Sequence, residues 1–128
     1  MPKKCLCEAS EVLIFPCSGG SNCGQIANQA AVKLTEDGIG KLFCLAGIGA
    51  HDTGMMDTAK AARKVVAIDG CVTACAKRTL EHAGVKVTDS VIVTDAGIKK
   101  AHNFNFSAKD VASLARIVAK GLRENVSA

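Results

Sequence analysis

The chain has 128 residues, of which 48% are hydrophobic and 22% charged, a composition typical of a single globular domain rather than a disordered chain. Its net charge of +4 comes without a long run of like charges, and it contains four Phe but no Trp or Tyr. This composition argues against a nucleic-acid partner, because base-stacking surfaces need aromatic side chains. No segment approaches the roughly 18 consecutive apolar residues of a membrane span, so we expect no membrane partner.

Short apolar runs, typical of buried strands, alternate along the chain with stretches of helical periodicity. The expected strands are residues 12–15, 41–46, 65–68 and 90–93. The expected helices run from about residue 22 to 36, 53 to 63, 71 to 82 and 108 to 122. Asn22 and Ser107 are the expected N-caps of the first and last helix, because Gln25 and Asp110 follow them at capping-box spacing.

This alternation predicts an α/β fold: a single three-layer domain over residues 1–128, with a four-stranded, mostly parallel sheet of flavodoxin- or Rossmann-like type. We favour the strand order 2-1-3-4, with 3-2-1-4 as the alternative. In either order, ligands are expected beyond the carboxyl ends of the strands.

Seven cysteines are the outstanding chemical feature: Cys5, Cys7, Cys17, Cys23, Cys44, Cys71 and Cys75. The residues after Met1 are polar and do not form an apolar signal core, so we expect a cytoplasmic protein. Cytoplasmic thiols are kept reduced, and an odd number of cysteines is poorly explained by a disulfide framework. The cysteines therefore indicate metal binding or thiol chemistry.

Four of these cysteines follow predicted strands. Cys17 and Cys71 come after the first and third strands, and Cys44 lies near the end of the second. Cys75 stands four residues beyond Cys71, a spacing that would place both sulfurs on one helix face. Because neighbouring parallel strands are about 4.8 Å apart, the four thiolates can converge on one ion. They suit zinc, with an iron–sulfur cluster as the alternative.

Cys44 and the three cysteines outside this set also fit other roles. Cys44 itself fits a structural role as well as a ligand role, because it lies in an apolar stretch. Cys23 is expected to fill space in the first helical turn. Cys5 and Cys7 form a Cys-x-Cys pair in the N-terminal tail, residues 1–10. This pair could be a separate soft-metal or redox site.

Three segments of the chain resemble the hallmarks of the DGC-domain family, small prokaryotic proteins described as zinc-binding. Residues 66–81 resemble its central motif, which contains Asp69-Gly70-Cys71. Residues 15–25 and 44–49 resemble its other two hallmarks, in the same order. The resemblance runs from about Leu13 to Val118. It implies that the four chelating cysteines of the family fall on Cys17, Cys44, Cys71 and Cys75.

Two functions therefore compete at the sequence level. The first is a zinc-binding protein with a structural, sensing or metal-handling role. The alternative is a thiol-dependent redox or transfer enzyme with Cys71 or Cys17 as the reactive cysteine, assisted by Asp69 or His51. Aspartates in such loops are more often helix caps than bases. The apolar, aromatic-poor helices would also permit a homodimer.

Overall fold

The computed structural model describes residues 11–124, so the Cys5–Cys7 pair lies outside the described residues. Four strands alternate with five α-helices and one 3₁₀ turn along this part of the chain. In chain order the elements are β1 (Val12–Pro16), α1 (Asn22–Glu36), β2 (Lys41–Leu42), α2 (Leu45–Gly49), α3 (Thr53–Ala61), β3 (Lys64–Asp69), α4 (Cys75–His82), β4 (Asp89–Ile92), η1 (Val93–Ala96) and α5 (Ala108–Glu124).

The sheet has the order β2-β1-β3-β4, and all three pairings are parallel. This confirms the α/β class and the favoured strand order, and it rules out the order 3-2-1-4. β1 and β3 form the centre of the sheet, with Phe15 beside Ala67. Both strands are almost wholly buried, which explains why they are continuous apolar runs rather than alternating ones.

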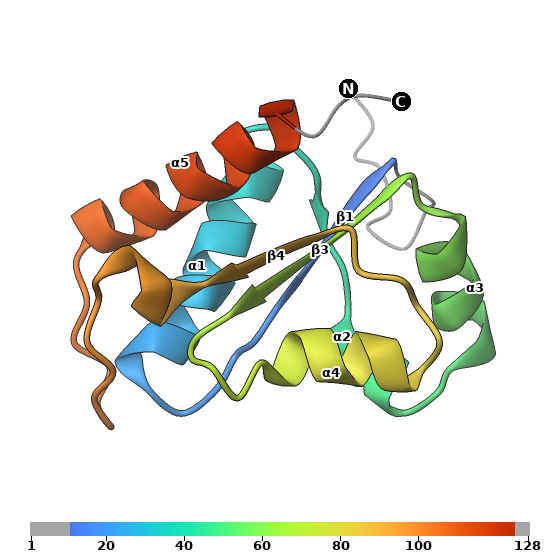
Figure 1. Ribbon diagram of the computed structural model, residues 1–128, viewed down its shortest axis with the longest axis horizontal. Helices are drawn as coiled ribbons and strands as arrows, with labels where there is room; N and C mark the ends of the chain where they lie inside the picture. The colour runs from blue at the N-terminus through green and yellow to red at the C-terminus, as the bar shows by residue number, and fades with distance from the viewer. Residues whose placement is uncertain (1–10, 125–128) are drawn as a thin grey trace.

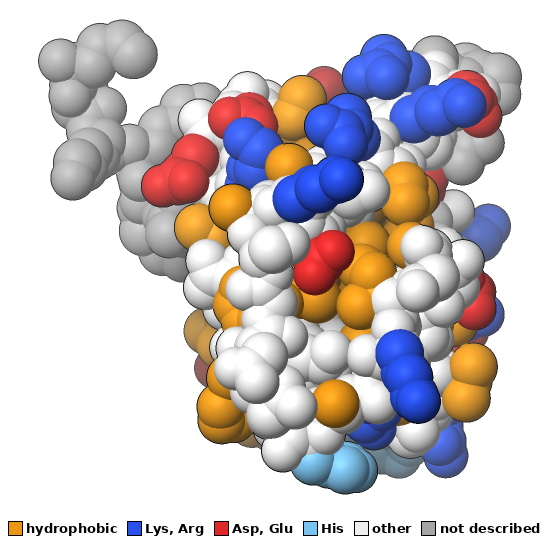
Figure 2. Space-filling model, turned by 90° about the vertical axis from the view of Figure 1, so that its left-hand side faces the viewer, with side chains coloured by type: hydrophobic (Ala, Val, Ile, Leu, Met, Phe, Trp, Pro, Cys, Tyr) orange, Lys and Arg blue, Asp and Glu red, His pale blue; other side chains and the backbone are white. Residues whose placement is uncertain are grey.

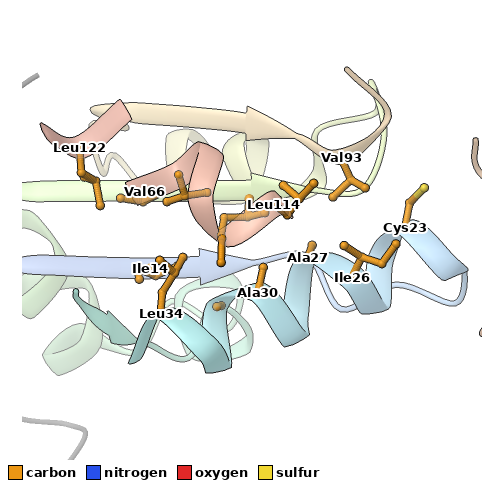
Figure 3. Close-up of a cluster of buried hydrophobic side chains, with 14 residues drawn as sticks. Ile14, Cys23, Ile26, Ala27, Ala30, Leu34, Val66, Val93, Leu114 and Leu122 are labelled. Atoms are coloured by element: carbon orange, nitrogen blue, oxygen red, sulfur yellow. The ribbon is translucent and has the colours of Figure 1, made fainter. Parts of the chain in front are cut away.

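Helices cover both faces of the sheet (Figure 1). α1 and α5 pack on one face over a core that includes Ile14, Val66 and Leu114. Figure 3 shows the α1 side chains of this core in a row, beginning at Cys23 in the first turn and ending at Leu34. α2, α3 and α4 pack on the other face around a second core. The result is the expected three-layer arrangement.

The second strand is shorter than the sequence predicts. β2 ends at Leu42, and the short helix α2, residues 45–49, begins before the expected end of the strand at residue 46. A short apolar run fits a strand or a buried helix equally well, so periodicity could not separate them. Ile48 of α2 is fully buried, and the Cys44 side chain accepts a hydrogen bond from the Gly47 N–H at 3.3 Å.

The ends of the helices agree with the sequence in one case and differ in another. Ser107 and Asp110 form the expected capping box at α5, with Asp110 N donating to Ser107 Oγ at 3.1 Å. At α1 the N-cap is Ser21, whose hydroxyl accepts from Gly24 N at 3.0 Å. The prediction that Asn22 caps this helix is therefore wrong.

Acidic and basic side chains are interspersed on the face shown in Figure 2, with hydrophobic side chains visible between them. Within residues 11–124, no helix combines the length and the apolar character that crossing a bilayer requires.

Candidate thiol site

Cysteines mark the carboxyl ends of three strands. Cys17 directly follows β1. One residue separates Cys44 from the end of β2, and one residue separates Cys71 from the end of β3. Cys75 is the first residue of α4. These thiols are free, and the side chains of Cys44 and Cys75 are exposed whereas Cys17 and Cys71 are half-buried. The edge that the sequence predicts for the site is therefore where these four residues lie.

Cys71 and Cys75 do not share a helix face. Residues 71–74 form a turn that ends at Ala74 in the left-handed conformation (φ 53°), and α4 begins only after it. The expectation of a helix from residue 71 is wrong for this reason. The i, i+4 argument for bringing the two sulfurs together fails with it.

Asp69 begins the Asp-Gly-Cys segment and fixes the start of α4. Its carboxylate is fully buried and accepts from the backbone N–H of Ala76 at 2.6 Å and of Lys77 at 3.2 Å. Ala74 at the N-cap position offers no side-chain hydrogen bond, so Asp69 replaces the missing cap. Burial raises the pKa of Asp69, while these two hydrogen bonds oppose the rise. The Asp69 carboxylate therefore fixes the start of α4.

Gly70 allows the end of β3 to pass close to the start of α1. A Cβ at this position would lie 2.9 Å from Gly24 N and 3.0 Å from the Cys23 carbonyl carbon. Gly24 is crowded in the same way, because its own Cβ would lie 2.7 Å from the Gly19 backbone. The glycines therefore let three backbone segments meet behind the thiols.

Cys71 lies at the tip of this turn in an environment that favours its thiolate. Its sulfur is 3.5 Å from the Thr73 hydroxyl and 3.5 Å from Lys100 Nζ, which donates a hydrogen bond to it. Hydrogen bonds from the side chain and backbone of Thr73 are the largest causes that lower the pKa of Cys71. Desolvation by burial opposes them, and the hydrogen bond and charge of Lys100 lower the pKa further.

Lys100 is held in place by Asn22 at the start of α1. The Asn22 amide donates to Lys99 O at 2.9 Å and its oxygen accepts from Ala101 N at 2.7 Å. The Asn22 backbone N–H also donates to Ala101 O at 3.2 Å. These three hydrogen bonds attach both neighbours of Lys100 to Asn22, although Lys99 and Ala101 lie 77 and 79 residues after Asn22 in the sequence. Asn22 thus attaches the loop that carries Lys100 to the start of α1.

Cys23 is distinct from the other thiols because it belongs to the core. Its side chain is fully buried, and its sulfur lies 3.7 Å from Ile98 O. Desolvation by burial is the largest cause that raises the pKa of Cys23, and the nearby Cys71 raises it further. This agrees with the space-filling role expected from the sequence.

Comparison with known proteins places the chain in a family. It matches the DGC domain over residues 13–118. The chain belongs to the DGC domain family. It is also similar to the anaerobic and virulence modulator AnvM of Pseudomonas aeruginosa, with 31% identity over 102 residues that cover 80% of this chain and 78% of AnvM. No solved structure matches it.

The four cysteines predicted to bind metal fit zinc in their donor chemistry but not in their present arrangement. Thiolate sulfur is a preferred zinc donor, and a structural site needs four ligands around one ion. Among residues 11–124, however, no three His, Cys, Asp or Glu side chains gather closely enough to hold an ion. A zinc site at Cys17, Cys44, Cys71 and Cys75 therefore stays a prediction of this DGC-domain sequence.

Sequence reasoning missed the residues that surround Cys71 in this DGC domain. Lys100 lies 29 residues further along the chain in a loop, where no local pattern indicates a contact with a thiol. The residue type and position of Asn22 suggested an N-cap. In the structure its side chain instead bonds to the backbone of Lys99 and Ala101. Asp69 caps α4, which confirms the helix-cap alternative for this residue, and Asp52 caps α3.

Proposed function

We propose that this protein is a thiol-based regulator of the cytoplasm, with Cys71 as its reactive residue and a hydroperoxide as its oxidant. The observation that carries the proposal is the contact between Cys71 Sγ and Lys100 Nζ at 3.5 Å. A reactive cysteine requires a cation or hydrogen-bond donors at its sulfur together with access from solvent. Cys71 has Lys100, Thr73 and a half-buried position.

The chemistry is that of a single thiolate. The Cys71 sulfur attacks one oxygen of the hydroperoxide, the O–O bond breaks, and the sulfur becomes a sulfenic acid. The departing hydroxide or alkoxide takes up a proton from water. Two electrons pass from sulfur to the peroxide, so no further reactant is needed. The sulfur then carries an added oxygen, which changes the size and hydrogen bonding of the group that faces Lys100.

Regulation rather than catalysis is supported by the family relationship. The similar protein of Pseudomonas aeruginosa is named an anaerobic and virulence modulator, and a response to oxidants accords with that name. Oxidation of Cys71 would change its contact with Lys100, which lies in the loop that Asn22 attaches to α1. A change of this kind at the surface is suited to signalling to a partner.

The test compares the thiols of the native protein with one another. Reduced protein is treated with one equivalent of hydrogen peroxide, sulfenic acid is trapped with dimedone, and the labelled peptides are quantified by mass spectrometry. We expect Cys71 to be labelled first, although Cys44 and Cys75 are more exposed. Exposure alone predicts the opposite order. Equal or faster labelling of Cys44 or Cys75 would therefore overturn the proposal.

Zinc binding is the second candidate function. It is favoured by the position of Cys17 and Cys71, which follow the hydrogen-bonded neighbours β1 and β3 at the same edge of the sheet. The side chains of Cys44 and Cys75 are exposed and would have to turn toward Cys71 to complete four ligands. An iron–sulfur cluster would need the same four thiolates.

Metal analysis separates these candidates. Untagged protein is purified without oxygen or chelator, and its metal content and absorption spectrum are measured. About one zinc per chain, lost in Cys71→Ser and Cys17→Ser but retained in Cys23→Ala, would establish the zinc site. Iron together with the absorption bands of a sulfide-bridged cluster would show that the bound group is an iron–sulfur cluster and not zinc. Protein without metal and with free thiols would refute metal binding and leave the Cys71 proposal standing.

A further inference from the structure

A pocket is lined by residues of α4 and of the chain around His51. The pocket has a volume of about 430 Å³ and is lined by Gly49, His51, Cys75, Arg78, Thr79 and His82. It is formed between α4 and the turn that connects α2 to α3, on the face of the sheet opposite α1 and α5 (Figure 1). The mechanism proposed for Cys71 uses none of these residues.

One face of α4 supplies most of the lining. Residues 75, 78, 79 and 82 are spaced as neighbours on a helix surface, while Ala76 and Leu80 on the opposite side are fully buried. The buried pair fixes the orientation of the helix on the sheet. The polar stripe therefore faces outward into the pocket as a consequence of core packing.

His51 enters the pocket from an unusual backbone conformation. It has a φ of 58°, in the left-handed region that residues with a side chain seldom adopt. The turn is held by bonds from His51 N to Ile48 O and from Asp52 N to Gly47 O, each 3.0 Å long. The imidazole ring lies beside that of His82, with 5.4 Å between the ring centroids. Strained residues of this kind concentrate at functional sites.

The pocket lining carries one permanently cationic side chain, Arg78, beside the imidazoles of His51 and His82. Among residues 11–124, no Asp or Glu belongs to this lining. Within residues 11–124, Arg78 forms no ion pair with a carboxylate. A guanidinium group binds oxyanions through parallel N–H donors. Thr79 adds a hydroxyl donor on the same face.

We propose that this pocket binds a small molecule through an oxyanion group, phosphate or carboxylate. Arg78 makes the ionic contact, and His51, His82 and Thr79 donate hydrogen bonds to the remaining oxygens. The position of Cys75 at the rim would place such a ligand next to a thiol of the family's central motif. The site is independent of the Cys71 proposal, since it shares no residue with it.

The test is a titration followed by NMR in a buffer without phosphate, at constant ionic strength. Inorganic phosphate and succinate are added separately, and the ring resonances of His51 and His82 and the side-chain N–H of Arg78 are observed. We expect saturable shifts at these three residues with at least one of the two probes. Phosphate alone, succinate alone or both would each support the site and would identify the oxyanion class.

Two variants decide whether the shifts report this pocket. Arg78→Ala should weaken binding at least tenfold, and Arg78→Lys should weaken it less, because the charge remains without the paired donors. Arg116→Ala removes an exposed arginine from α5 on the opposite face and should leave binding unchanged. Linear, non-saturating shifts with both probes, or equal affinity in Arg78→Ala, would overturn the proposal.

Discussion

Replacing Gly70 with alanine would place a methyl group against the backbone at the first turn of α1. The nearest atoms to that methyl are Gly24 N at 2.9 Å, the Cys23 carbonyl carbon at 3.0 Å and Gly24 Cα at 3.1 Å. All three are backbone atoms, so a change of side-chain rotamer cannot relieve the contact. The end of β3 or the start of α1 has to move.

The magnitude follows from the kind of contact. Inserting a methyl group into a well-packed region costs about 1–3 kcal/mol. For a domain of this size, each kcal/mol lowers the melting temperature by about 4 °C. We therefore expect Gly70→Ala to melt about 4–12 °C below the native protein. The shift also separates the Cys71 turn from Lys100, whose loop is attached to α1 through Asn22, so Cys71 should react more slowly with iodoacetamide.

The assay is thermal unfolding followed by circular dichroism, with Gly121→Ala as the matched control. Gly121 lies inside α5, and among residues 11–124 its added Cβ meets no atom outside its own helix backbone within 4 Å, so alanine there should raise stability by up to about 1 kcal/mol. The two glycines thus predict opposite signs for the same substitution. A melting temperature of Gly70→Ala equal to or above that of the native protein would refute the close-approach argument.

Three other outcomes are expected. Lys100→Gln should raise the pKa of Cys71, so the reaction of Cys71 with iodoacetamide should slow at neutral pH and its pH profile should move to higher pH. Lys99→Gln is the control. An unchanged pH profile in Lys100→Gln would contradict the contact between Lys100 and the Cys71 thiolate. Asp69→Ala leaves two amides of α4 without their acceptor and should cost about 1–3 kcal/mol in chemical denaturation; an unchanged midpoint would rule out its capping role. Native protein at neutral pH should be alkylated at Cys71 long before Cys23, because burial raises the pKa of Cys23 while its neighbours lower that of Cys71; mass spectrometry that found Cys23 modified first would contradict this.

The sheet was predictable because its evidence is spread over the whole chain. Buried strands such as residues 65–68 are continuous apolar runs, and each is followed by a turn and a helical pattern. Crossover rules then leave few parallel orders. The capping box at Ser107 was equally readable, since both of its partners lie within four residues. Signals of this kind need no knowledge of the tertiary structure.

The errors occurred in short segments whose sequence fits two different local structures equally well. Residues 43–46 suit a strand by composition, but the chain forms α2 from Leu45 and buries Ile48 within it. A helix was expected to begin at about residue 71, directly after the third strand. The buried Asp69 carboxylate instead accepts hydrogen bonds from the N–H groups of Ala76 and Lys77, and α4 begins only at Cys75. In both cases tertiary contacts outweighed local preference.

The candidate site was predicted in its location but not in its electrostatics. Strand ends and cysteines sufficed to place the thiols at one edge of the sheet. The charge at Cys71 comes from Lys100, which reaches the sulfur only because Asn22 holds the surrounding loop. A contact between residues 29 positions apart through a loop leaves no periodic trace. It became visible only with the structure.

The three residues of the Asp-Gly-Cys segment are ordered by the direction in which β3 leaves the sheet. Asp69 is the last strand residue and is still buried, so its carboxylate can reach only the first turn of the helix beneath it. Gly70 is the point of closest approach to α1, where any side chain would collide with backbone. Cys71 is the first residue past that crossing and therefore the first whose side chain can reach solvent and Lys100 together. Exchanging any two of them would bury the thiol or expose the cap, so the order itself follows from the geometry of a parallel strand that ends beside a helix.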